Sequence, residues 1–241
     1  VVKESNKWLH KRAGMCYDKG NFTKGKNRQM LGRTHFFIGT AAALAVLQPQ
    51  TVPALVAGAG AAAIGGLISD IDVGTSQAHR DADKIITATV AVAVLTILAE
   101  YKLNLGIYRR LTSDSSVLRL LTGTAAFLLI CAYGKQQPHR SFMHSFAALA
   151  LLTACVDIIY PDVSAYFAVG FLSHLVLDFF NRKPEKLFWP WKKGFCLGLC
   201  SARGLVNRAL LGCGMVSLAV VLVLSAPAGR LMAKIMRAIY G

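Results

Sequence analysis

The chain has 241 residues, of which 54% are hydrophobic and only 16% are charged, and its formal net charge is +15. A soluble domain has about 25% charged residues, so this composition argues against one and predicts a polytopic membrane protein. The basic residues lie mainly between the apolar runs, where membrane topology explains them better than nucleic-acid binding does. We therefore expect no nucleic-acid partner.

Residues 1–33 form a basic polar arm that contains nine Lys or Arg residues. The arm has no amphipathic periodicity, and its charge predicts that it is flexible or lies on anionic headgroups. Residues 34–226 form the predicted membrane domain, and residues 227–241 are expected to be a basic C-terminal tail.

The membrane domain contains seven apolar runs, each near the roughly 20 residues that a helix needs to cross a bilayer. They cover residues 35–49, 51–69, 84–100, 116–133, 141–160, 162–180 and 205–226. Some runs are short, so we expect an all-α transmembrane helical bundle of five to seven spans. Pro49, Pro53 and Pro161 predict tight turns between spans, and the small residues of "AGAGAAAIGG" predict close helix packing.

The distribution of Lys and Arg predicts a cytoplasmic N-terminus. In that orientation the inner segments hold 20 of the 27 basic residues, as the positive-inside rule requires. The exception is the loop at 100–119, where "LNLGIYRRL" could instead form an interfacial helix. We expect an integral protein of the bacterial cytoplasmic membrane, with a polar site at the cytoplasmic helix ends.

Histidine and aspartate residues gather at the predicted inner ends of these spans. They lie at the start of the first span, the end of the second, the start of the fifth and the end of the sixth: His35, Asp70, Asp72, His139, His144, His174 and Asp178. His79 follows the second span and is a possible extra ligand or base. His174 and Asp178 are four residues apart, so they share one helix face.

Each cluster alone has an ordinary explanation. His35 could be an interfacial residue, Asp70 and Asp72 a helix cap, and His174 with Asp178 an interhelical hydrogen bond. Their shared membrane depth favours a metal site, because imidazole and carboxylate are the usual ligands of first-row divalent ions. A buried aspartate in a membrane helix costs about 2.5–3.5 kcal/mol on insertion scales, and a cation would offset that cost.

Four short motifs in order strengthen this interpretation: "TH" at 34–35, "SDID" at 69–72, "PHRSFMHS" at 138–145 and "GFLSHLVLDFFNRKPEKLFWPW" at 170–191. Together they resemble the YdjM-type membrane-bound metal-dependent hydrolases, a family distantly similar to zinc-dependent phospholipase C. The departures are Ser69 in place of Pro, Ser141 and Met143 within the His-Arg motif, and Asn181 in place of Thr. They spare the residues that the resemblance implies as ligands.

The resemblance implies hydrolysis of a phosphoester at a site with two or three divalent ions, zinc first and manganese or magnesium as alternatives. Either Asp70 or Asp72 could act as a base, and Arg140 could hold a phosphate oxygen. The expected partners are membrane lipids with anionic phospholipid headgroups, while the oligomeric state is left open. The alternatives are a cation- or proton-coupled transporter and a membrane scaffold with a structural metal.

Overall fold

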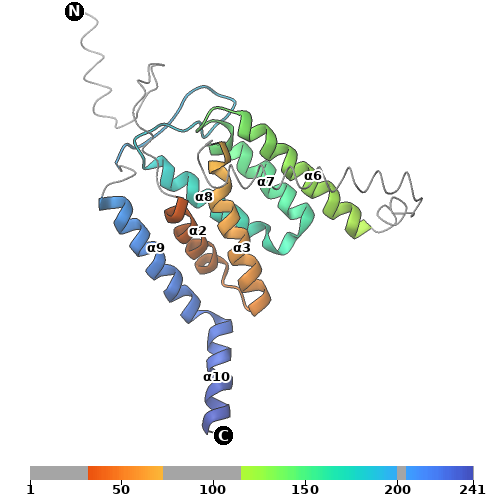
Figure 1. The fold of residues 1–241 in the computed structure, drawn as a ribbon, viewed down its shortest axis with the longest axis vertical. Helices are drawn as coiled ribbons and strands as arrows, with labels where there is room; N and C mark the ends of the chain where they lie inside the picture. The colour runs from red at the N-terminus through yellow and green to blue at the C-terminus, as the bar shows by residue number, and fades with distance from the viewer. Residues whose placement is uncertain (1–31, 73–114, 200–204, 241) are drawn as a thin grey trace, which may run out of the picture.

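The computed structural model describes residues 32–72, 115–199 and 205–240, and within these ranges the chain is helical and forms no strand (Figure 1). Seven α-helices and two short 3-10 helices are present in the described ranges: α2 (Gly32–Leu47), α3 (Val52–Ile68), η1 (Ser69–Asp72), α6 (Ser115–Gln136), η2 (Phe142–His144), α7 (Phe146–Ile159), α8 (Pro161–Phe179), α9 (Leu205–Leu224) and α10 (Ala226–Tyr240). The predicted all-α class is confirmed.

Four helical segments are long and apolar enough to cross a membrane, and α2 and α7 are shorter apolar helices. The four are Val52–Asp72, Ser116–Gln136, Pro161–Phe179 and Leu205–Leu224. They coincide with four of the predicted runs, and α2 coincides with a fifth. The predicted span 84–100, and most of the loop 100–119, lie outside the described residues.

The helix at the fifth predicted run begins later than expected. We predicted a span over 141–160, but α7 starts at Phe146 because Ser145 caps it, accepting a hydrogen bond from the Ala148 backbone N–H at 3.2 Å. Residues 142–144 form the short helix η2 in place of a first turn of α7. The irregular segment 137–145, which includes η2, places His139 and His144 at the polar end of the bundle.

Small residues let α3 and α8 approach closely, as the "AGAGAAAIGG" stretch predicted. A Cβ atom added at Gly65 would lie 2.2 Å from the Phe167 carbonyl oxygen, and one at Gly170 would lie 2.2 Å from the Ala62 carbonyl oxygen. Neither contact leaves room for a methyl group, since backbone atoms stand in the way. The close contact fixes α8, which carries His174 and Asp178, against α3, which leads into Asp70 and Asp72.

Replacing Gly170 with alanine is therefore expected to separate these helices and destabilise the protein by about 1–3 kcal/mol, or more if the backbone cannot shift. Gly60→Ala on α3 is the matched control, because a Cβ there meets nothing within 4 Å. That variant should be neutral or slightly more stable, as alanine favours a helix over glycine. Thermal unfolding of both variants in detergent checks this, and equal stability of the two would contradict it.

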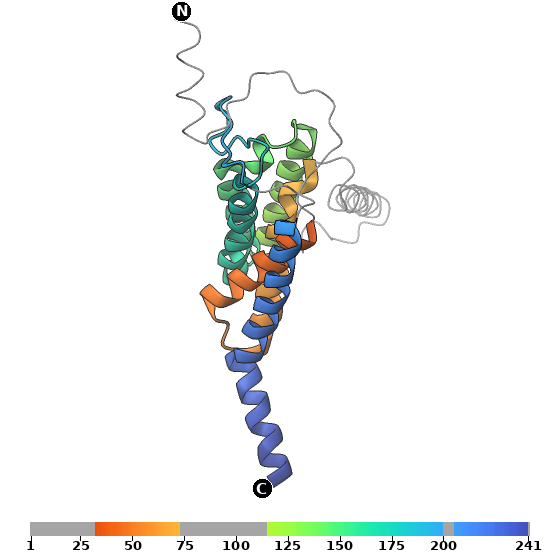
Figure 2. The ribbon, with the colours of Figure 1, turned by 90° about the vertical axis from the view of Figure 1, so that its left-hand side faces the viewer.

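The helix ends that carry the predicted polar residues lie at one end of the bundle. The start of α2 and the start of α9 are joined by a hydrogen bond of 3.0 Å from Thr34 Oγ1 to Asn207 Oδ1, and α3, α6 and α8 end at this same end of the bundle. Loops, among them residues 181–199, cover these helix ends in Figure 2. The other end of α9 continues into α10, which projects away from the bundle (Figure 2).

The C-terminal segment, which we expected to be a basic tail at 227–241, is helical. Residues Ala226–Tyr240 form the helix α10. Ser225 lies between α9 and α10, and its hydroxyl accepts a hydrogen bond from the Ala228 backbone N–H at 3.4 Å. With Pro227 in the first turn, these are ordinary signals for a helix start.

Candidate metal centre

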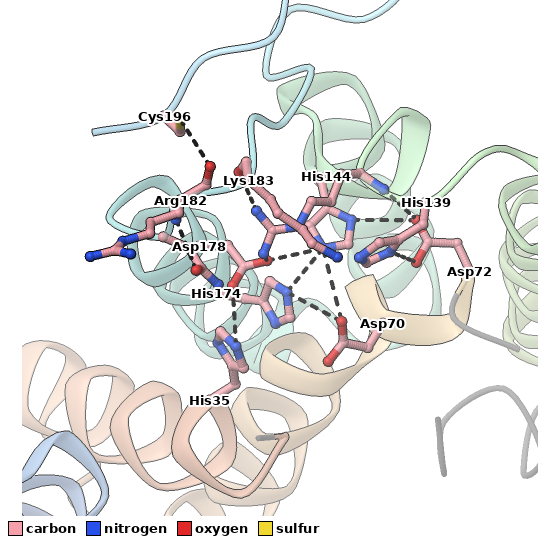
Figure 3. Close-up of polar contacts among 12 residues, drawn as sticks. His35, Asp70, Asp72, His139, His144, His174, Asp178, Arg182, Lys183 and Cys196 are labelled. Atoms are coloured by element: carbon pink, nitrogen blue, oxygen red, sulfur yellow. Dashed lines mark hydrogen bonds and ion pairs between the residues drawn. The ribbon is translucent and has the colours of Figure 1, made fainter. Parts of the chain in front are cut away.

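The structure brings seven of the predicted site residues into one cluster at the polar end of the bundle (Figure 3). His35 comes from α2, Asp70 and Asp72 from η1, His139 and His144 from the segment before α7, and His174 and Asp178 from α8. His79 lies outside the described residues. Helices far apart in sequence therefore supply the cluster, which depends on their packing.

The possible ligand atoms fall into three overlapping groups, and within each group they lie within 4.8 Å of one another. The groups are His35 with His174 and Asp178, Asp70 with His144 and His174, and Asp72 with His139 and His144. His174 and His144 each belong to two groups. Because the groups share these two imidazoles, the cluster is one continuous centre.

The orientation of His174 is fixed by main chain. Its Nδ1 lies 2.8 Å from the carbonyl oxygen of Gly66, and a carbonyl can only accept, so Nδ1 carries the proton. The lone pair is then on Nε2, which faces Nε2 of His144 at 3.3 Å. Such an orienting bond to the second ring nitrogen is typical of histidines that bind metals.

The donor set fits a divalent ion. Two nitrogen ligands at about 2.0–2.1 Å from a tetrahedral zinc are roughly 3.3 Å apart, which matches the His144 and His174 pair. Asp70 Oδ1 lies 3.9 Å from Nε2 of both histidines, and Asp178 Oδ2 lies 3.5 Å from Nε2 of His144. Asp178 Oδ1 and His35 Nδ1 are buried without a hydrogen-bond partner among the described residues.

Asp70 and Asp72 have different surroundings although they belong to one motif. Asp72 is held by His139 Nδ1, 2.8 Å from its Oδ1, and by the Arg140 backbone N–H, which donates to its Oδ2 at 3.2 Å. Its side chain is fully buried, whereas that of Asp70 is 17% exposed. The side chain of His139 is 24% exposed, so Asp70 and His139 form the side of the centre that is open to the surroundings.

Arg140 is buried beside Asp178. Its Nη2 donates to Asp178 Oδ2 at 2.5 Å, and its Nη1 donates to the carbonyl oxygen of Lys183. Its backbone φ of 63° is unusual for a residue other than glycine and costs of order 1–3 kcal/mol. The structure thus places this guanidinium as the partner of a candidate ligand, with the loop at 183 as its second contact.

Glu185 was not predicted as part of the site. It is fully buried, and both its carboxylate oxygens lack a hydrogen-bond partner among the described residues. Its backbone pairs with Phe195, and the next residue, Lys186, donates its N–H to the carbonyl oxygen of Arg140. The "NRKPEK" stretch looks like an ordinary basic loop, so only the fold reveals that one of its side chains is enclosed.

Burial raises the pKa of the Glu185 carboxyl to about 8, so the folded state keeps a proton that the unfolded state has lost above pH 4.5. Stability should therefore fall as the pH rises from about 4.5 through 8, and Glu185→Gln should remove this loss. In the metal-free protein we expect the variant to melt about 5 °C higher than the parent at pH 8.5 and at the same temperature at pH 4.

Asp162→Asn is the control for that measurement, because Asp162 is exposed in the first turn of α8, away from the polar end. Thermal unfolding of the three proteins in detergent at both pH values gives the comparison. The prediction would be contradicted if Glu185→Gln and the parent had the same melting temperature at both pH values.

Fold and site together define an integral membrane protein whose helix ends enclose a histidine and aspartate centre suited to metal ions. The model of the YdjM inner membrane protein family matches residues 30–238, and the chain belongs to this family. The predicted family and the inner-membrane location are thereby confirmed. No curated protein and no solved structure matches the chain.

Proposed function

We propose that this protein is a membrane-embedded, metal-dependent hydrolase that cleaves a phosphoester of a lipid or lipid-like substrate near the inner leaflet. The observation that carries the proposal is the seven-residue centre, which offers nitrogen and carboxylate donors for more than one ion at a helix-end depth. A structural zinc site needs only four ligands around one ion, whereas this centre offers seven ligand residues in three overlapping groups.

Bound divalent ions would polarise a phosphoryl oxygen and lower the pKa of a bound water. Asp70 is the better candidate for the base that receives the proton from the attacking water, because its carboxylate is partly exposed. Asp72 is already held by His139 and the Arg140 backbone, so it suits an orienting role. Arg140 keeps Asp178 in place, and contact with a phosphate oxygen would require its guanidinium to reorganise.

The loop at 181–199 supports a lipid as the substrate. Phe188 and Trp191 are 48% and 70% exposed, and Lys192 and Lys193 beside them are also exposed. Aromatic rings suit the headgroup level of a bilayer, and the lysines would attract anionic headgroups to this end of the molecule. Trp189 has a different role, since it packs edge-on against Tyr133 and Phe142.

The test is a lipid hydrolysis assay on the full chain in nanodiscs, after chelation and after return of Zn²⁺, Mn²⁺ or Mg²⁺. Mass spectrometry of phosphatidylglycerol, phosphatidylethanolamine, phosphatidic acid and cardiolipin would detect cleavage. We expect cleavage of at least one lipid to depend on metal and to disappear in Asp70→Asn. Stoichiometric metal without cleavage of any lipid would point to a scaffold, and metal or proton flux into liposomes to a transporter.

A further inference from the structure

The helix α10 has one basic face and one broad apolar face. Arg230, Lys234 and Arg237 recur at spacings of four and three residues, so they share a face, and the helix contains no acidic residue. Four large side chains occupy the rest of the surface: Leu231, Met232, Ile235 and Met236 are 58%, 61%, 44% and 47% exposed. This is the pattern of a helix that lies in a membrane interface.

The described residues do not cover this apolar face. The helix projects beyond the end of the bundle (Figures 1 and 2). Its four large apolar side chains remain exposed. An isolated helix of 15 residues is only marginally stable in water, because nucleation is costly and no packing compensates for it. A surface outside the described structure must therefore stabilise α10.

The position of α10 favours a bilayer as that surface. It follows α9, a 20-residue apolar helix of membrane-spanning length, with only Ser225 between them. The cap at Ser225 and Pro227 in the first turn start a separate helix, so α10 can take a direction different from that of α9. The chain thus reaches the bilayer surface where the amphipathic helix begins.

This surface lies at the end of the bundle away from the metal centre. The start of α9 is hydrogen-bonded to the start of α2 beside His35, whereas its last turn, at Val221 and Leu224, lines a cavity with Leu44 and Gln48 near the end of α2. We propose that α10 lies along the anionic bilayer surface at this far end, with its apolar face among the acyl chains and its three cations among the headgroups. The proposal does not rest on the proposed hydrolase activity.

Hydrogen exchange of the full chain in nanodiscs tests the proposal. Discs of phosphatidylcholine would be compared with discs that also contain 30% phosphatidylglycerol, and exchange would be followed in peptides from residues 226–240. We expect the anionic lipid to slow exchange of these amides at least tenfold. The triple variant Arg230→Gln, Lys234→Gln and Arg237→Gln should lose that difference between the two lipids.

Arg33→Gln with Arg208→Gln is the matched control, because these arginines are exposed at the starts of α2 and α9, at the opposite end of the bundle. This double variant should keep the full lipid dependence of α10. Equal exchange in the two kinds of disc would overturn the proposal. Slow exchange only in discs that hold two chains would also overturn it, since a second copy would then cover the apolar face.

Discussion

The His174→Ala variant is expected to insert into the membrane like the parent but to lose its bound metal. His174 belongs to two of the three ligand groups, and its free nitrogen faces His144 at 3.3 Å. Loss of an outer-shell partner alone reduces metal affinity about 10–100-fold, so the loss of a shared ligand should exceed that. Elemental analysis of the purified protein, with a metal titration, gives the measurement.

Asp157→Asn is a suitable control for that variant. Asp157 is exposed on α7 and accepts a hydrogen bond from Ser164 at 2.8 Å, outside the three ligand groups. Its replacement should leave the metal content unchanged. Equal elution of all three proteins in size-exclusion chromatography would show that the variants are folded. Full metal occupancy in His174→Ala would contradict the assignment of the centre.

Arg140→Ala is expected to destabilise the metal-free protein by about 3–5 kcal/mol, because it leaves the Asp178 carboxylate buried without its cation. Alanine retains Cβ, so the strain of the positive φ is little changed and the loss reports mainly the guanidinium. Unfolding by denaturant in detergent, without metal, provides the measurement.

A double-mutant cycle identifies the cause of that loss. In an Asp178→Asn background the carboxylate that pairs with Arg140 is already gone, so Arg140→Ala should cost clearly less than it does in the parent. Addition of metal to the Arg140→Ala variant should also recover stability, because a cation near Asp178 replaces the missing charge. The same cost in both backgrounds would show that the pair does not interact.

The sequence was sufficient to predict at which end of the bundle the polar residues lie. It was not sufficient to predict which of their side chains contact one another. Apolar run lengths located the ends of α2, α3 and α8, and from these we could infer that His35, Asp70 and His174 share one end of the bundle. The contact of Arg140 with Asp178 depends on a left-handed backbone turn and on how each helix is rotated, and run lengths carry no information on either.

Two other features were missed for different reasons. The enclosure of Glu185 is produced by the loop that folds back at Phe195, a long-range contact without a local signal. The helix α10 did have a signal, since its cations and apolar residues follow a helical period. We described residues 227–241 only by their charge, as a basic tail, and assigned no helix to them.

The groups that orient this centre are largely main-chain atoms. The Gly66 carbonyl positions His174, the Arg140 N–H holds Asp72, and the Lys183 carbonyl anchors the Arg140 guanidinium. An alanine scan cannot delete any of these groups. At position 66 an added Cβ would lie 3.0 Å from the His35 carbonyl oxygen, so the variant would report crowding while the acceptor remained in place. The side chain at position 183 can therefore diverge among relatives without a change in how Arg140 is held, whereas position 66 is restricted to glycine by the nearby His35 carbonyl.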